Sequence, residues 1–458
     1  MKSIYTPNDF KQLSSDSEMI QAAVDEAAKY SAEVVIPRYN ERTGKPIWEL
    51  DRSVVLKNGS YVVIENAHIR LMDGAYCHFF ENEAGEDGKR WWKREGRNSN
   101  IRIEGRGNAL LDGGIHNGIF EHLFTLYDEN GNFAGRREYK GYKNAFINIG
   151  IDFKNAEHIS VSGLNFVNQR YWAMCFRFCS HVHISDVNFE ALANVPNQDG
   201  IDIREGCRDF LVENITGKTG DDTIALTNFG LFKLISDGEE PEMSTDIRDV
   251  IIRNVRSHLT DECDIIRILN RGGNKIYNVQ ISGIIDTTDE YSEGRALAAI
   301  RIGDICDYQS RLNLPGEVRN ITVRDVVTRA RFGCYIANSI VDSTFDNIMM
   351  TSDGGVGMYF NGCAIKNVFV DKLTYNSLAK PSDKLLGYKG VFHKVFIDEI
   401  NAMHFNNSTA ENLFVSGVIS GKGMKYVFGG NSEIDIRADR VVMLDSKTKL
   451  TDKAKILR

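Results

Sequence analysis

The chain has 458 residues, of which 42% are hydrophobic and 26% charged, a composition typical of a folded globular protein and not of a disordered chain. Its formal net charge is −8, from 55 Lys and Arg against 63 Asp and Glu, so no overall positive field attracts nucleic acid or anionic lipid. No stretch has the length of a membrane span, and MKSIYTPNDF lacks the pattern of a secretion signal. We therefore expect a cytoplasmic protein with no nucleic-acid partner and no membrane partner.

Glycine and cysteine usage narrows the class further. Forty glycines against seven prolines suit many short strands and tight turns, because such turns need positive φ and strands must keep their N–H donors. The eight cysteines are scattered without a CxxC pair, which indicates reduced thiols in the core. We expect no disulfide framework, no bound metal and no cofactor.

Helical periodicity is confined to the start of the chain. Ile20, Val24 and Ala27 recur at helical spacing behind two good N-cap residues, so we expect one helix within 15–32. From residue 33 onwards, short alternating stretches are typical of strands and turns.

A short phrase recurs along these strands: a polar residue followed by two aliphatic residues with one position between them. Most steps between phrases are 20 to 29 residues, the length of one coil of a parallel β-solenoid that returns ~4.8 Å further along. Longer steps predict coils with loop insertions, or two coils each. A β-sandwich also has short strands, but it gives no reason for one phrase to repeat at one-coil spacing. The phrases are NIRI at 100, HISV at 158, HVHI at 181, DFLV at 209, DVII at 249, NVQI at 278, NITV at 320, NIMM at 347, NVFV at 367 and NLFV at 412.

The repeat predicts an all-β parallel β-helix that forms one domain over 1–458. The helix within 15–32 would cap the first coil and block edge-to-edge association. The first coils would occupy 33–115, an aromatic loop insertion 116–145, and the remaining coils and the C-terminal end 146–458.

Two acidic segments can be laid over each other with a constant offset of 23 residues, NQDGIDI at 197–203 and GDDTIAL at 220–226. On a β-helix this offset stacks Asp199 on Asp222 and turns the aliphatic residues of both segments inward. Asp221 lies beside the stack, and Gly220 permits the turn or bulge that would bring it to the same side. The sequence thus predicts a cluster of three carboxylates.

Such a cluster suits acid and base chemistry. Stacked carboxylates repel, so without a cation or a shared proton one of them should have a raised pKa. Cleavage of a glycosidic bond with inversion needs a protonated carboxyl for the leaving oxygen and a carboxylate ~6.5–9.5 Å away to activate water. Two other interpretations remain open: a calcium site, since Asn197 and the aspartates offer oxygen ligands, and ordinary solvated turn acids.

These motifs resemble glycoside hydrolase family 28, the polygalacturonases and their relatives. NQDGIDI and GDDTIAL look like the family's N-T-D-G-I-D and G-D-D-x-I-A-[IL] motifs, and MIQAAVDEAAKYSAEVVIP, NIRIEGRGNALLDG and Tyr171-Trp172 are also similar to family members. The resemblance covers about residues 15–305. It implies a right-handed parallel β-helix of the pectin-lyase type that hydrolyses O-glycosyl bonds. By motif, Asp221 would be the general acid, while Asp199 and Asp222 would hold and activate the water.

Two positions depart from the family pattern. Asp264 stands where the family's G-H-G histidine belongs, and R-I-K becomes Arg301-Ile302-Gly303, so the lysine is missing. Because an arginine and lysine pair suits the carboxylate of a galacturonate ring, losing one cation argues for another sugar or another mode of binding. Arg267, one rung before Arg301, could compensate, although pairing with an acid is the alternative. A loop histidine, His258, could return an imidazole to the groove, or be solvated. The predicted substrate-binding residues are Asn197, Trp172, His258, Asp264, Arg267 and Arg301.

Aromatic residues gather in two stretches that interrupt the coil rhythm, 76–94 and 116–142. They could wall one end of a saccharide groove, because the C–H faces of sugars pack on aromatic rings. For Trp91 and Trp92, covering the flank of the solenoid or forming a subunit contact is the alternative. The second stretch contains Phe120, Phe124, Tyr127, Phe133, Tyr139 and Tyr142.

Together these features predict a glycoside hydrolase that acts on imported oligosaccharides derived from pectin or from related plant or microbial glycans. A lyase, an epimerase or a fructan-type transferase on the same scaffold is the first alternative, because the missing histidine and lysine permit another reaction. A non-catalytic carbohydrate-binding protein is the second. The expected partner is an oligosaccharide, and a homo-oligomer is compatible with the sequence.

Overall fold

The chain consists of two compact units, one of residues 1–223 and 238–244 and the other of residues 224–237 and 245–458. The prediction of a single domain over 1–458 is not decided by this division and stays a prediction. The described residues include no helix with the length and hydropathy needed to cross a membrane. The computed structural model describes residues 2–86, 90–115, 117, 125–127, 133–136, 148–230, 241–259, 263–289, 294–304, 313–351, 355–375, 389–390, 395–396, 400–421 and 423–457.

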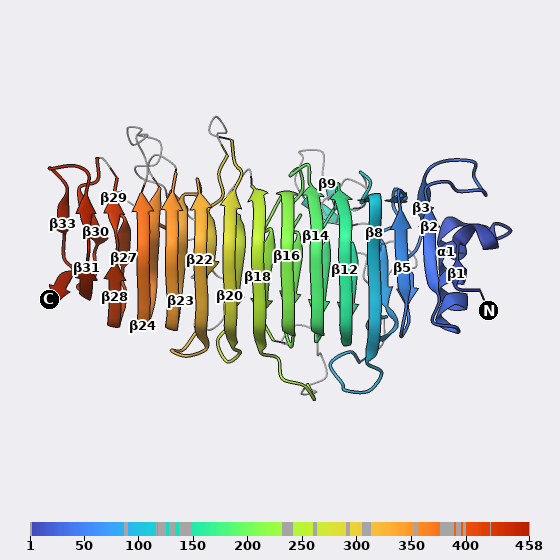
Figure 1. Cartoon of the computed structure of the whole chain (residues 1–458), viewed down its shortest axis with the longest axis horizontal. Helices are drawn as coiled ribbons and strands as arrows, with labels where there is room; N and C mark the ends of the chain where they lie inside the picture. Colours follow the sequence, from blue (N-terminus) through green and yellow to red (C-terminus); the bar gives the residue numbers. More distant parts are fainter. Residues whose placement is uncertain are drawn as a thin grey trace. The chain divides into compact units, whose positions relative to one another are not determined.

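The first unit is a stack of parallel strands with one α-helix, α1 (Asp16–Ala28), at its N-terminal end (Figure 1). Two short 3-10 helices, η1 (Pro7–Phe10) and η2 (Glu83–Gly85), join the strands. The strands β9 and β10 pair antiparallel with each other. The strands are β1 (Ile4–Tyr5), β2 (Glu33–Pro37), β3 (Trp48–Leu50), β4 (Val54–Leu56), β5 (Tyr61–Glu65), β6 (His68–Leu71), β7 (Phe80–Asn82), β8 (Asn98–Asp112), β9 (Thr125–Tyr127), β10 (Phe133–Arg136), β11 (Ile151–Lys154), β12 (Ala156–Val167), β13 (Met174–Arg177), β14 (Ser180–Glu190), β15 (Ile201–Arg204) and β16 (Arg208–Lys218).

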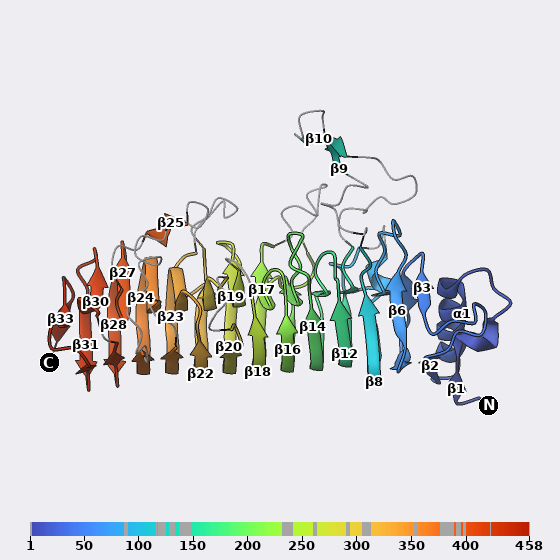
Figure 2. The ribbon, with the colours of Figure 1, turned by 90° about the horizontal axis from the view of Figure 1, so that it is seen from above.

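The second unit is also a stack of parallel strands, which follow one another in chain order (Figure 2). Its one antiparallel pair among the described residues is β25 with β26. The strands are β17 (Ile224–Asn228), β18 (Ile247–His258), β19 (Asp264–Asn270), β20 (Ile276–Asp286), β21 (Ala298–Ile302), β22 (Val318–Thr328), β23 (Phe332–Met350), β24 (Val356–Tyr375), β25 (Lys389–Gly390), β26 (Val395–Phe396), β27 (Met403–Asn406), β28 (Thr409–Ser416), β29 (Ile419–Ser420), β30 (Tyr426–Gly430), β31 (Asp435–Asp439), β32 (Val442–Met443), β33 (Lys449–Thr451) and β34 (Lys455–Leu457).

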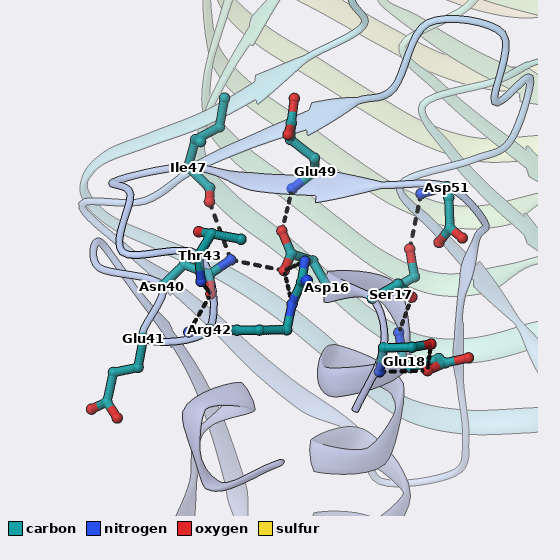
Figure 3. Close-up of polar contacts among 12 residues, drawn as sticks. Asp16, Ser17, Glu18, Asn40, Glu41, Arg42, Thr43, Ile47, Glu49 and Asp51 are labelled. Atoms are coloured by element: carbon teal, nitrogen blue, oxygen red, sulfur yellow. Dashed lines mark hydrogen bonds and ion pairs between the residues drawn. The ribbon is translucent and has the colours of Figure 1, made fainter. Parts of the chain in front are cut away.

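The N-terminal helix is fixed to the first strands by a buried carboxylate. Asp16, the first residue of α1, accepts hydrogen bonds from Asn40 Nδ2 at 2.8 Å, Arg42 Nη2 at 2.6 Å and the backbone N of Glu49 at 2.8 Å (Figure 3). A negative charge in this position also favours the helix dipole. The helix contacts β1, β2, β3 and β4, so it covers the first strands as predicted.

The strand register confirms the repeat. Ile159 pairs with Val182 and Val182 with Phe210 in the first unit, which are the predicted steps of 23 and 28 residues. These side chains are buried and form the inward ladder of the core. In the second unit, Val250 pairs with Val279, a step of 29 residues.

The register also settles two long steps. Val279 pairs directly with Ile321, and Val368 pairs directly with Leu413, so each of these steps is one coil with an insertion and not two coils. One phrase was placed at the wrong point of its coil: Asn347 does not align with Asn320, because Thr322 pairs with Thr344 and Arg324 with Asp346.

A left-handed backbone position explains why the phrase begins with a polar residue. Each first residue of the ten phrases has φ between 52° and 59°, a conformation that Asn and Asp tolerate best after glycine. In the second unit these side chains also connect neighbouring coils: Asn278 donates to Asp249 at 2.8 Å and Asn320 donates to Asn278 at 3.1 Å.

Each long strand bends again a few residues later, at what we call the second left-handed position. Asn347 belongs to this set, which explains why its phrase is out of step. The set is Gly163, Asp186 and Asn214 in the first unit and Asn254, Gly283, Asp325, Asn347, Lys372, Gly417 and Arg440 in the second, with φ between 50° and 70°.

Candidate active site

The three aspartates singled out in the sequence lie together in the first unit. One carboxylate oxygen from each of Asp199, Asp221 and Asp222 lies within 4.8 Å of the others. Asp199 and Asp222 are buried and Asp221 is half-buried. Among the described residues, this is the one group of three or more His, Cys, Asp or Glu side chains close enough to share an ion.

Backbone hydrogen bonds hold the two acidic segments side by side. Gly200 N donates to Asp222 O at 2.9 Å, and Ile201 N donates to Thr223 O at 3.0 Å. Parallel strands bonded in this way place Asp199 next to Asp222. The offset of 23 residues read from the sequence is therefore the offset in the structure.

A tight turn brings Asp221 to the same side. Gly220 N and Asp221 N both donate to Gln198 O, at 3.1 Å and 3.3 Å, and Thr219 Oγ1 donates to Asp221 O at 2.7 Å. A Cβ on Gly220 would lie 2.8 Å from Gln198 Oε1 and 2.9 Å from Ala193 Cα. The glycine is therefore required by close approach, whereas we had expected it to permit a turn or bulge.

Both oxygens of Asp221 accept backbone hydrogen bonds. Asn197 N donates to Oδ2 at 3.2 Å, and Asp222 N donates to Oδ1 at 3.0 Å. These donors favour the carboxylate, whereas two neighbouring negative charges favour the acid. Asn197 has φ of 62°, so the predicted sugar-binding residue also shapes the turn that orients Asp221.

A fourth acid, Asp202, belongs to the same neighbourhood and was not singled out in the sequence. It lies on β15, is 1% exposed, and its Oδ2 has no hydrogen-bond partner among the described residues. Burial raises the pKa of Asp202 well above its ordinary value; Arg204 opposes the shift, and the negative charges of Asp222 and Asp221 add to it. Its position in NQDGIDI, between two inward isoleucines, was the available signal, because it must then face outward.

Trp172 lies between cations and not on an open surface. The guanidinium carbons of Arg204 and Arg177 lie 4.9 Å and 5.8 Å from the centroid of its ring. Arg177 is buried and donates to Asp152 at 3.0 Å, and Lys154 pairs with the same carboxylate at 2.8 Å. This row of charges on β11, β13 and β15 surrounds the indole that we predicted to bind sugar.

Neighbouring Tyr171 is also affected by the acids. Burial raises the pKa of Tyr171, and the charges of Asp199 and Asp202 add to that shift. Its ring packs against Trp172 with centroids 4.8 Å apart. The tyrosine hydroxyl therefore remains protonated beside the carboxylate cluster.

The other predicted binding residues lie in the second unit, where three of them form a buried ionic network. Arg301, 1% exposed, pairs with Asp264 at 3.2 Å and with Asp304 at 2.7 Å, and Arg267 pairs with Asp304 at 3.1 Å. Arg267 lies beside Arg301 on neighbouring strands, as expected. The alternative that Arg267 pairs with an acid therefore holds, although its side chain is 13% exposed and not at the surface.

His258 lies at the end of β18, where its Nδ1 is 3.3 Å from Thr287 Oγ1. The two tryptophans at 91 and 92 pack edge to face, and Trp91 also packs on Phe178 with centroids 5.8 Å apart. This contact supports the interpretation that they cover the flank of the coils. Most of the aromatic stretch 116–142, including Phe120, Phe124, Tyr139 and Tyr142, lies outside the described residues.

Comparisons with known proteins agree with this picture of fold and motif. Residues 132–234 match the family model for glycosyl hydrolases family 28, a stretch that includes all four acids of the site. A search of curated proteins finds no match to the chain.

The structure is similar to a mutant tailspike protein of E. coli bacteriophage HK620 in complex with a hexasaccharide, with a TM-score of 0.55 and 12% identity over 98% of this chain and 78% of that chain. It is also similar to an exopolygalacturonase of Thermotoga maritima (TM-score 0.43, 11% identity, 100% and 92% covered). A family 28 exopolygalacturonase of Yersinia enterocolitica gives a TM-score of 0.45 at 14% identity, with 100% and 80% covered. The tailspike likeness confirms the right-handed parallel β-helix, and the family match places a glycoside hydrolase signature on it.

Proposed function

We propose that this protein is a glycoside hydrolase that uses Asp199, Asp221 and Asp222 to cleave oligosaccharides derived from pectin or from related plant or microbial glycans. The observation that carries the proposal is the convergence of these three carboxylates within 4.8 Å on two hydrogen-bonded segments. The match of residues 132–234 to the family 28 model supports the same reaction class.

In the proposed reaction, Asp221 protonates the leaving oxygen of the glycosidic bond, while Asp199 and Asp222 bind water and remove its proton as it attacks the anomeric carbon. The water adds to the sugar, the bond to the leaving oxygen breaks, and the proton lost by Asp221 is regained from solvent. The backbone donors and the two neighbouring charges act on Asp221 in opposite directions, so their balance sets the basic limb of the pH profile.

Inversion is the stereochemical outcome that we propose. The carboxylate oxygens lie closer than the ~6.5–9.5 Å typical of inverting pairs, because Asp199 and Asp222 together hold one water. NMR of the first product anomer tests this point, and a retained configuration would exclude it.

The experiment for the reaction class uses a panel of uronic and neutral oligosaccharides with a reducing-end assay. We expect Asp221→Asn to lower kcat roughly 10²- to 10⁴-fold without altering the far-ultraviolet circular dichroism. Asp186→Asn is a matched control, since it removes the same charge at an exposed position of β14. Near-full activity of Asp221→Asn would remove this residue as the acid.

A second candidate is a cation-dependent lyase on the same scaffold. Three carboxylate oxygens within 4.8 Å also fit the oxygen ligands that calcium prefers. Elimination would raise ultraviolet absorbance and would stop on addition of a chelator, whereas hydrolysis gives new reducing ends at constant absorbance and is insensitive to the chelator. The same panel therefore separates the two reactions.

A further inference from the structure

An apolar column runs along the outward face of the second unit, two residues after each second left-handed position. Each member is paired with the next across neighbouring strands. Ile285, Val327 and Val442 are 40%, 37% and 49% exposed, and Met349 and Ile419 are half-buried. In full, the column reads Arg256, Ile285, Val327, Met349, Thr374, Ile419 and Val442, and we call its five apolar members the apolar stripe.

The position itself does not require apolar residues. The corresponding column of the first unit, again two residues after the second left-handed positions, consists of Asn165, Asn188 and Thr216. Within the second unit, an adjacent outward column on β20, β22 and β23 consists of Gln280, Thr322 and Thr344. Solvent-facing sheet positions are normally polar, so a continuous apolar column is typical of a surface that is covered.

A column of charged residues flanks the stripe on the side before the second left-handed positions. Positive charges, on Arg253 and Arg324, lie toward the N-terminal end of the unit, and negative charges, on Asp346, Asp371 and Asp439, lie toward the C-terminal end. The full column is Arg253, Ser282, Arg324, Asp346, Asp371, Ser416 and Asp439. Its two ends therefore have opposite charge, and the column is complementary to a reversed copy of itself.

We propose that the apolar stripe is the interface of an antiparallel homodimer, with a two-fold axis at the coil of Met349. Rotation about an axis that lies in the interface, perpendicular to the stack, reverses the order of coils and keeps the flanking column opposite itself. Arg324 of one copy then faces Asp371 of the other, and Arg253 faces Asp439. The stripe meets the stripe, with Ile285 opposite Ile419 and Met349 opposite Met349.

The central coil also suits this arrangement. The Asp346 side chains of the two copies would approach each other there, and each is held by Lys372 of its own chain at 3.2 Å. Seven coils at ~4.8 Å spacing extend over about 29 Å, a length that suits an interface of roughly 800 Å² per partner. A parallel arrangement would place the stripe on the stripe but would bring the flanking column against the opposite flank.

The test measures the dimer dissociation constant by analytical ultracentrifugation of the full chain. Val327→Lys places two buried charges in the dimer, so we expect binding roughly 30-fold weaker or more. Thr322→Lys is the matched control, since it adds the same side chain to the same strand on the adjacent face, and it should leave the dissociation constant unchanged. Circular dichroism establishes that each variant is folded.

A charge exchange tests the antiparallel order. Arg324→Glu alone and Asp371→Arg alone should each weaken the dimer, because each places like charges opposite each other, and the double variant should restore it. A wild-type chain that stays monomeric up to its solubility limit, or a dimer that survives Val327→Lys, would overturn the proposal. Disruption by Val327→Lys without recovery in the double variant would overturn the antiparallel order. None of these residues belongs to the carboxylate site, so the result is independent of the proposed hydrolysis.

Discussion

Asp202 and Asp152 lie on neighbouring parts of one charged face, yet their titration should affect stability in opposite directions. Burial raises the pKa of Asp202 well above its ordinary value, whereas in Asp152 the effect of burial is outweighed by Lys154, Arg177 and His78, which lower the pKa to about 2. Replacement of each by the isosteric asparagine removes its titration and leaves the strand positions filled.

For Asp202, the folded chain retains a proton that the unfolded chain has lost. Between the ordinary aspartate pKa, about 4, and the raised folded value, this linkage decreases the free energy of unfolding by about 1.4 kcal/mol for each pH unit. We therefore expect Asp202→Asn to be near neutral around pH 4 and to become progressively more stable than the parent chain as the pH rises. The gain stops at the folded pKa.

For Asp152 the sign is reversed. Its depressed pKa contributes about 2 kcal/mol, present above the unfolded pKa and lost as the pH falls toward about 2. Asp152→Asn should therefore be destabilised at neutral pH, and the difference from the parent should shrink under acid conditions.

The assay is urea unfolding of the parent and both variants across a pH series, followed by intrinsic fluorescence. Opposite slopes of the stability difference against pH are the expected result. A flat or falling difference for Asp202→Asn would refute the reasoning, because it would mean that Asp202 is ionised in the folded chain and stabilised by Arg204.

Three further predictions concern the site and the coils. Gly220→Ala should lower activity at least tenfold and shift the unfolding midpoint downward, because its Cβ would lie within 3 Å of Gln198 and Ala193; unchanged kinetics would exclude the close approach. Arg301→Leu should destabilise the second unit by roughly 3–5 kcal/mol, since it leaves the carboxylates of Asp264 and Asp304 buried without that cation, and a smaller loss in Asp264→Asn/Arg301→Leu would identify the charge as the cause. Asn320→Ala should cost roughly 1–2 kcal/mol of unfolding free energy because its φ is 53°, whereas Asn320→Gly should cost less; equal costs in chemical denaturation would contradict a left-handed strain.

The fold was predictable because one backbone constraint repeats in every coil. A left-handed residue followed by two inward aliphatics leaves a recognisable phrase, so Asn278 and Asn320 indicate the coil length without any knowledge of the structure. The same signal misplaced Asn347, because a coil contains two left-handed positions and the phrase alone does not distinguish them.

The site was predictable only as far as strand alternation and offset reach. Laying Asp199 over Asp222 needs nothing more than a fixed coil length, and the structure brings the two together with Asp221. The protonation of Asp202 depends on burial by side chains from several strands, and no local spacing encodes that. The partners of Arg301 were missed for the same reason, because Asp304 follows the strand and acts only through a tertiary ion pair.

The convergence of Asp199 with Asp221 and Asp222 has an evolutionary consequence. All three come from two successive turns of the chain, held by hydrogen bonds between those turns alone. Gain or loss of a whole repeat elsewhere would leave this pair of turns intact. Descendants of such a gene can therefore lengthen or shorten the surface that meets a glycan while inheriting the same reactive centre.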